Sequence, residues 1–395
     1  MLEEGAYFER PIDLRNPIVF YEGHLPAFSV NTLVKLALGE DGIDPQLEVL
    51  FARGIDPDSV DAAKSPVDAW PGREVVQAYG TAADELIIRA IREAPIDDGL
   101  NPQRSNANAL FTILEHEQMH QETLLYMFHQ LPYELKRRVK TIGRSQALSK
   151  TAERIDGGMI AIPPGVATLG LEANLFGWDN EFPLHQVEVP GFSIGRYNVT
   201  NGEFLDYMRA TGAPSPHFWA KDEQGWKRRG MFALEPLPLS CPVYVTHEEA
   251  VAFASWRGMR LPTEAEYHRA AFGTPDGAEN SFPWGDAPPD ASRGNFDFSH
   301  WDPVPVGSYP SGVSAFGVHD MIGNGWEWTS TLFGPFDGFE PGASYPEYSA
   351  DFFDDRHFVM KGASPVTARE LIRSSFRNWF RPNYPYVYAS FRCVL

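Results

Sequence analysis

The sequence is poor in cysteine and has no long apolar run. Only Cys241 and Cys393 occur among 395 residues, which excludes a disulfide framework and indicates a reducing compartment, the cytoplasm. No stretch approaches the ~20 consecutive apolar residues that span a bilayer, so we expect no membrane segment. The first residues, MLEEGAYFERP, are acidic and lack an apolar core, and we therefore expect no secretory signal.

Positive charge is also scarce. Lys and Arg number 33 against 53 Asp and Glu, which gives a formal net charge of −20 at pH 7. Proteins that bind nucleic acid neutralise phosphates with basic side chains, so we expect no nucleic acid partner. At roughly 100–200 residues per domain, the length predicts two or three domains.

Glycine, proline and tryptophan are abundant, and the tryptophans are unevenly distributed. The chain has 34 Gly, 33 Pro and 10 Trp, and nine of the tryptophans lie between Trp178 and Trp379. Residues 1–150 instead show helical apolar spacing over 17–38, with a kink at Pro26, and over 75–96 and 102–131. These patterns predict an antiparallel helical bundle over 1–150. We expect a loop-rich α+β domain over 151–395, with helices at 201–211 and 247–257 and aromatic rings filling its gaps.

The segment LEHEQMHQETL carries the strongest chemical signal. His116 and His120 are four residues apart, so on a helix both imidazoles lie on one face and can chelate one metal ion. The same letters satisfy the His-Glu-x-x-His pattern of zinc proteases, in which Glu117 would be the base. That enzyme class also needs a third ligand downstream and a peptide-binding cleft. Glu122, about 200° round the helix from His120, is better placed to support a ligand than to bind the metal.

A third histidine, His24, lies in the apolar helix-like segment FYEGHLPAF. Three neutral imidazoles on facing bundle helices would leave adjacent coordination positions open, as an oxygen-activating iron(II) centre requires. Spacing alone does not distinguish iron from zinc.

Two groups of motifs carry a family resemblance that covers nearly the whole chain. RNPIVFYEGHLPAF and HEQMHQE resemble the iron-binding DinB-like four-helix bundle of the ergothioneine- and ovothiol-type sulfoxide synthases. The later motifs resemble the formylglycine-generating-enzyme or sulfatase-modifying fold, which is C-type-lectin-like and follows the bundle in that family. These motifs are RLPTEAEYHRAA (260–271), FPWGD (282–286), VGSYPSGVSAFGVHDMIGNGWEWTSTLF (306–333), FVMKGAS (358–364) and SSFRNWFRPNYPYVYASFRC (374–393).

The resemblance implies that Fe(2+) is held by His24, His116 and His120. It implies an O2-dependent reaction that joins a thiol, cysteine or γ-glutamylcysteine, to the imidazole of hercynine in ergothioneine biosynthesis. A catalytic tyrosine is also implied, and Tyr345 and Tyr348 match that region equally. The implied substrate-binding residues are Asn378 and Trp379, whose ring could hold a trimethylammonium group, together with Arg377, Phe380 and Arg381.

The chain departs from the family pattern near the expected thiol site. Synthases that use γ-glutamylcysteine commonly have an acidic residue where this chain has Phe380, and Arg-Gly-Gly-Ser where it has KGAS (361–364). Met119 replaces a polar residue often found before the second histidine. The sulfur donor is therefore open, as is a selenium donor, which would make the chain a selenoneine synthase. An ovothiol-type synthase that uses histidine and cysteine is a further alternative.

Three rival functions predict different features. A formylglycine-generating enzyme would need a pair of cysteines near its substrate, and none is apparent. A non-catalytic, lectin-like binding protein would place no metal on the three histidines. A DinB-type zinc or nickel thiol transferase would leave the second domain unexplained.

Overall fold

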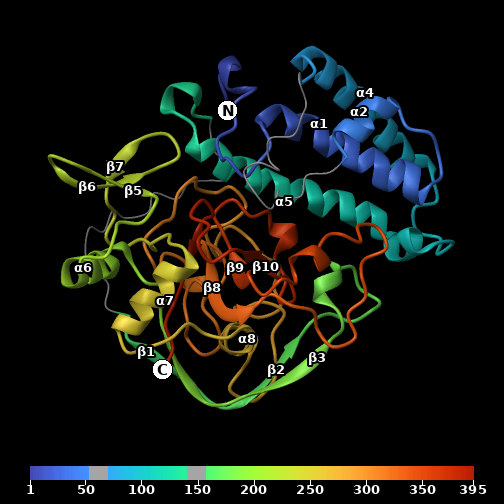
Figure 1. The fold of residues 1–395 in the computed structure, drawn as a ribbon. Helices are drawn as coiled ribbons and strands as arrows, with labels where there is room; N and C mark the ends of the chain where they lie inside the picture. The colour runs from blue at the N-terminus through green and yellow to red at the C-terminus, as the bar shows by residue number, and fades with distance from the viewer. Residues whose placement is uncertain (53–69, 140–156) are drawn as a thin grey trace. The chain divides into compact units, whose positions relative to one another are not determined.

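The computed structural model describes residues 1–52, 70–139 and 157–395, and its chain forms two compact units (Figure 1). The first unit contains Met1–Val139 and two short segments from later in the chain, Asn174–Phe176 and Gly342–Pro346. The second unit contains the rest. The domain boundary expected between residues 150 and 151 lies outside the described residues.

The first unit is helical (Figure 1). Helix α1 (Ile18–Ser29) packs against both α4 (Arg73–Glu93) and α5 (Asn108–Gln130). Helix α1 includes Pro26, which has no backbone N–H to donate, and a π-helix, η2 (Val30–Ala37), follows α1 directly. Shorter elements complete the described part: η1 (Glu4–Ala6), α2 (Pro45–Leu50), η3 (Pro102–Ala107) and η4 (Tyr133–Leu135).

The predicted end of α5 agrees with the structure better than its predicted start. Helix α4 ends shortly before Pro95 and α5 ends shortly before Pro132, as expected for residues that cannot continue a helix. The prediction that the last helix starts at Pro102 was wrong, because that segment forms the 3-10 turn η3. Asn106 and Ala107 there have φ values of 54° and 49°, and left-handed residues interrupt α-helical bonding. Helix α5 therefore starts at Asn108.

Apolar side chains of all three long helices form the core of this unit. One cluster joins Phe28, Leu33 and Ala37 to Ala90 of α4 and Ile113 of α5. A smaller cluster joins Val30 and Val34 to Ala83. Packing of this kind supplies most of the stability of a helix in a protein. That the unit is a DinB-like four-helix bundle stays a prediction.

The second unit mixes short strands with helices and much irregular chain. Its largest sheet has the strand order β10-β9-β8-β11, in which β11 pairs with β8 in parallel and the other pairs are antiparallel. The strands of this sheet are β8 (Gly325–Leu332), β9 (Phe358–Ala363), β10 (Asn378–Phe380) and β11 (Ala389–Ser390).

Smaller sheets pair neighbouring segments. Strand β1 (Met159–Ile162) pairs with β4 (Phe192–Gly195), and β2 (Gly165–Leu169) pairs with β3 (His185–Val189). A three-stranded sheet contains β5 (Trp219–Asp222), β6 (Gly225–Arg229) and β7 (Leu234–Pro236). These strands and the helices of the second unit agree with the α+β domain expected from the sequence.

The helices of the second unit begin at threonines. Helices α6 (Asn201–Thr211), α7 (His247–Trp256) and α8 (Glu264–Phe272) each follow a threonine that forms a capping box with a glutamate three residues later. This motif satisfies backbone N–H groups at the helix start. The predicted helices at 201–211 and 247–257 are confirmed within one residue. The 3-10 turns are η5 (Asp179–Glu181), η6 (Pro310–Gly312), η7 (Ala350–Phe352) and η8 (Arg369–Leu371).

The core of the second unit lies where α8 packs against β2, β8 and β9. It contains aromatic and aliphatic side chains, among them Tyr267, Phe272 and Phe296. Within the described ranges, no helix is both long enough and apolar enough to cross a membrane.

Candidate metal centre

Three histidines from two helices of the first unit meet at one point. His24 comes from α1, and His116 and His120 come from successive turns of α5. The nitrogen atoms that they offer all lie within 4.8 Å of one another, and His24 Nε2 is 3.2 Å from His116 Nε2. Two neighbouring nitrogen ligands of one metal ion, each ~2.1 Å from it, are separated by about 3 Å. The spacing therefore suits a shared metal ion.

The orientation of His24 is fixed by a backbone contact from a distant segment. Its Nδ1 lies 2.7 Å from the carbonyl oxygen of Phe51, so Nδ1 donates and Nε2 keeps its lone pair for a metal. The Phe51 ring packs so closely on Gly23 that a Cβ there would lie 2.5 Å from ring carbons. A glycine before His24 is therefore needed for this arrangement.

All three imidazoles are held in the neutral form that binds metals. Burial lowers the pKa of His24 to about 4, against a small opposing effect of its bond to Phe51. Burial also lowers the pKa of His116 and of His120 well below the usual value, and the neighbouring imidazoles add to the shift. The Nδ1 atoms of His116 and His120 have no hydrogen-bond partner among the described residues. The donor set thus fits a metal ion that takes neutral nitrogen ligands.

Aromatic side chains of α1 pack against the histidines. Phe20, one turn before His24, stacks on it with ring centres 5.0 Å apart. Phe28, one turn after His24, stacks on His116 with ring centres 3.5 Å apart and an interplanar angle of 10°. The ring centre of Tyr21 lies 5.6 Å from that of His120. The face of α1 that carries the candidate ligand His24 also provides apolar walls, which limit access of water.

Of the two candidate tyrosines, Tyr345 belongs to the histidine-containing unit. Its ring centre is 6.3 Å from that of His116 and 5.3 Å from that of Phe28. The segment that carries Tyr345 contacts η3 and the first residue of α5. Ser344 bonds to Asn108 of α5, and Gln103 of η3 donates to the Ala343 carbonyl at 3.0 Å. These contacts place Tyr345 in the cluster around the candidate metal site.

Tyr348 belongs to the second unit and lies among other aromatic rings. It stacks on Trp178 with ring centres 4.0 Å apart, and its edge faces Trp379 at 5.2 Å. Trp379 also stacks on Phe333 at 4.1 Å. Both Tyr348 and Trp379 are half-buried, so the group can present ring surface to a ligand.

The other predicted substrate residues surround β10. Asn378 is half-buried, and its Oδ1 accepts from the Trp379 backbone N–H at 2.9 Å. Phe380 stacks on Tyr384, and Arg381 is half-buried. Arg377 is only 3% exposed, and its Nε lies 3.1 Å from the Glu264 carboxylate.

The two cysteines are poor candidates for catalysis. Cys241 and Cys393 are both buried and unpaired. Burial raises the pKa of each thiol to about 12, so both are protonated near neutral pH and weakly nucleophilic.

Known proteins resemble this chain over much of its length. Residues 145–395 match the sulfatase-modifying factor enzyme 1-like domain family. The hercynine oxygenase of Mycolicibacterium thermoresistibile is 35% identical over 331 residues, which cover 76% of this chain and 72% of the relative. That of Mycolicibacterium smegmatis is 34% identical, with coverage of 71% and 70%. Ergothioneine biosynthesis protein 1 of Neurospora crassa is 28% identical and aligns with the whole chain over 55% of its own length.

The chain belongs to the hercynine oxygenase family. The expectation of an oxidoreductase of this type is therefore confirmed, and so is the sulfatase-modifying domain in the second half of the chain. Membership of this enzyme family argues against the alternative of a non-catalytic, lectin-like binding protein.

Some residues at the site of this hercynine oxygenase relative were not predicted from the sequence. Phe20 and Phe28 flank His24 at four-residue spacing in both directions, a pattern that could have been found. The Phe51 carbonyl and the stacking of Trp178 on Tyr348 join segments far apart in the chain, and no local pattern signals them.

Proposed function

We propose that this chain is an iron(II)- and O2-dependent sulfoxide synthase that joins a thiol to an imidazole carbon of hercynine in ergothioneine biosynthesis. The observation that carries the proposal is the cluster of His24, His116 and His120 in a chain of the hercynine oxygenase family. In this reaction an imidazole C–H and a thiol S–H are replaced by a C–S bond. O2 supplies the sulfoxide oxygen, and its other atom leaves as water with both hydrogens.

The three histidines would hold the iron. Because all three are neutral, they add no negative charge, and three ligands leave room for two substrates and O2. A bound iron(II) would supply O2 activation and favour the thiolate form of a bound thiol. The rings of Phe20 and Phe28 keep the imidazoles in place and limit water around them.

Tyr345 is the better candidate for the catalytic tyrosine. Its ring packs within the cluster that includes Phe28 and contacts His116. A phenol there can give a proton or a hydrogen bond to the reacting oxygen at a fixed position. Tyr348 lies in a different unit and has a different set of neighbours.

We assign the trimethylammonium group of hercynine to the aromatic cluster of the second unit. Tyr348 and Trp379 meet edge to face, and Trp178 stacks on Tyr348. Aromatic faces attract quaternary ammonium groups through the ring quadrupole. Asn378, which immediately precedes Trp379, supplies a polar group beside the rings.

Few residues near β10 indicate which sulfur donor the enzyme uses. Phe380 stacks on Tyr384 with ring centres 5.1 Å apart and offers no carboxylate to an amino group of γ-glutamylcysteine. This favours cysteine over γ-glutamylcysteine. Arg381, half-buried one residue later, is a candidate for a donor carboxylate. A selenium donor, or histidine in place of hercynine, would define the selenoneine- or ovothiol-type alternative.

We also propose that the helical unit is a DinB-like bundle and that the protein works in the cytoplasm. Helices α1 and α5 place metal ligands on facing surfaces, as expected for a bundle site. Both cysteines are free, which agrees with a reducing compartment.

The test is a reconstitution with iron(II) under anaerobic conditions, followed by O2 and pairs of substrates. Hercynine or histidine is combined in turn with cysteine, γ-glutamylcysteine and a selenium donor, and products are identified by mass spectrometry. We expect hercynine with cysteine to give a C–S-linked sulfoxide that contains one oxygen atom from labelled O2. Absence of substrate-dependent O2 consumption with every pair would contradict the proposal.

A further inference from the structure

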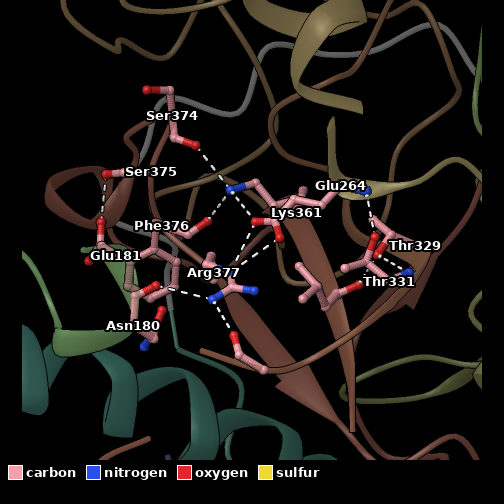
Figure 2. A network of polar contacts seen from close by, with 12 residues as sticks. Asn180, Glu181, Glu264, Thr329, Thr331, Lys361, Ser374, Ser375, Phe376 and Arg377 are labelled. Atoms are coloured by element: carbon pink, nitrogen blue, oxygen red, sulfur yellow. Dashed lines mark hydrogen bonds and ion pairs between the residues drawn. The ribbon is translucent and has the colours of Figure 1, made fainter. Parts of the chain in front are cut away.

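The five residues that lead into β10, Arg373–Arg377, are held by buried charged groups, and Figure 2 shows the contacts of the last four of them. Arg373 Nε lies 2.7 Å from Glu181 Oε2, and the Ser375 hydroxyl donates to the same oxygen at 2.6 Å. Arg377 Nε lies 3.1 Å from Glu264 Oε1. Side chains alone thus anchor three of the five residues.

Lys361 holds the other two residues through their backbone. It lies in β9 and is only 2% exposed. Its Nζ donates to the Ser374 carbonyl at 3.0 Å and to the Phe376 carbonyl at 2.6 Å, and lies 3.6 Å from Glu264 Oε1 (Figure 2). One ammonium group therefore connects β9, the segment before β10 and the first residue of α8.

The charges in this network do not balance. Two carboxylates, Glu181 and Glu264, face three cations, Lys361, Arg373 and Arg377. In a poorly solvated environment each of these contacts is strong, and loss of one partner leaves an uncompensated buried group. The network therefore fixes the backbone that it contacts.

Strand β10 needs such support because its sheet pairing is short. It has three residues, lies at the edge of its sheet and pairs with β9 through Asn378–Met360, Trp379–Val359 and Phe380–Phe358. A short edge strand with neighbours on one side is weakly held by its ladder alone. The network acts on the residues directly before Asn378 and Trp379.

We propose that Lys361 is a positioning residue for the substrate site, because its hold on Ser374 and Phe376 fixes where Asn378 and Trp379 lie. The inference rests on the proposed function, because that function assigns hercynine binding to Asn378 and Trp379. It assigns Arg377 to the same supporting network rather than to direct contact with substrate. Lys361 itself is not a catalytic residue.

The test compares Lys361→Met, which removes the ammonium group, with Lys361→Arg, which keeps a cation. Lys221→Met, an exposed position in β5, is the matched control. We expect Lys361→Met to weaken hercynine binding about tenfold in anaerobic calorimetry, because a small displacement of binding groups is costly. We expect iron occupancy to be unchanged, Lys361→Arg to restore most of the binding, and the control to match the wild type.

The pH dependence gives a readout that a general loss of stability would not produce. Burial lowers the pKa of Lys361 to about 8, although Glu264 partly opposes this, and Arg377 and Glu181 also act on it. Above pH 8 Lys361 loses its proton and its attraction to Glu264. Hercynine binding to the wild type should therefore weaken above pH 8, whereas binding to Lys361→Arg should not follow this profile.

Hydrogen exchange of residues 374–380 tests positioning without any substrate. We expect faster exchange in Lys361→Met than in the wild type and in Lys361→Arg. Equal exchange in all three proteins, or hercynine binding by Lys361→Met at wild-type strength, would overturn the inference. A wild-type protein that binds no hercynine and converts no substrate pair would instead contradict the proposed function. Hydrogen exchange would then still show whether Lys361 holds residues 374–380 in place.

Discussion

Tyr345 and Tyr348 are three residues apart in the chain but belong to different units. Tyr345 packs with Phe28 and His116 in the helical unit, whereas Tyr348 stacks on Trp178 in the second unit. Sequence alone could not separate them, because both lie in the same short motif, SYPEYSADFF. The difference depends on contacts with segments that are distant in the chain.

Removal of the two hydroxyl groups should have unequal effects. Tyr345→Phe should keep its ring packing and iron binding but lower the rate of sulfoxide formation about 10²-fold, the usual contribution of a positioned proton donor. Tyr348→Phe keeps the ring that would face the ammonium group and should stay close to the wild-type rate. Single-turnover kinetics with product analysis measure both. A larger loss for Tyr348→Phe than for Tyr345→Phe would reverse the assignment.

The candidate metal ligands were easier to recognise in the sequence than the residues around them. His116 and His120 follow from four-residue spacing on a helix, and the apolar context of His24 singled it out. The arginines show the limit of such reasoning. Arg377 occurs in a motif that suggested substrate contact, but the structure surrounds it with Glu264 and the carbonyl oxygens of Asn180 and Gly334. A sequence does not reveal which carboxylate will form an ion pair with a given arginine.

Helix α8 connects local sequence signals to the buried network. Its cap, Thr263, accepts from the Glu266 N–H at 3.1 Å, and Glu266 accepts from the Thr263 N–H at 2.8 Å. The first residue of the helix is Glu264, the carboxylate that Lys361 and Arg377 share. The start of this helix therefore affects both stability and the network before β10.

Loss of the α8 cap should destabilise the second unit. Thr263→Ala should lower the free energy of unfolding by about 1–2 kcal/mol, the usual value of an N-cap side chain. Thr263→Ser keeps the hydroxyl and serves as the control, with a smaller loss. Urea denaturation followed by circular dichroism measures both variants. Equal stability of the Ala and Ser variants would show that the cap contributes little.

Elements with strong local signals were the most predictable. Helical patterns in the sequence identified α4, α6 and α7 to within about three residues at each end. The late start of α5 was missed because nothing in the sequence forces Asn106 and Ala107 into left-handed conformations. The order β10-β9-β8-β11 was not predicted either, since it depends on pairing between residues far apart in the chain.

At the scale of the whole molecule, the two parts of the chain that differ in composition, 1–150 and 151–395, carry two kinds of side-chain cluster. The described helical sequence of the first part contains the three histidines, and the Trp-rich sequence of the second part contains the aromatic cluster around Trp379. The similarity to hercynine oxygenases covers most of the chain, so both parts belong to one enzyme.

The most direct test of the metal centre is an anaerobic titration with iron(II), with bound iron measured after gel filtration. His24, His116 and His120 form one candidate group, so the wild type should bind one iron(II) ion per chain. His24→Ala, His116→Ala and His120→Ala should each lose most of it. The control is His129→Ala, a buried histidine of α5 outside that group, which should keep full occupancy. Full iron occupancy in His120→Ala, or none in the wild type, would contradict the assignment of iron to these three histidines.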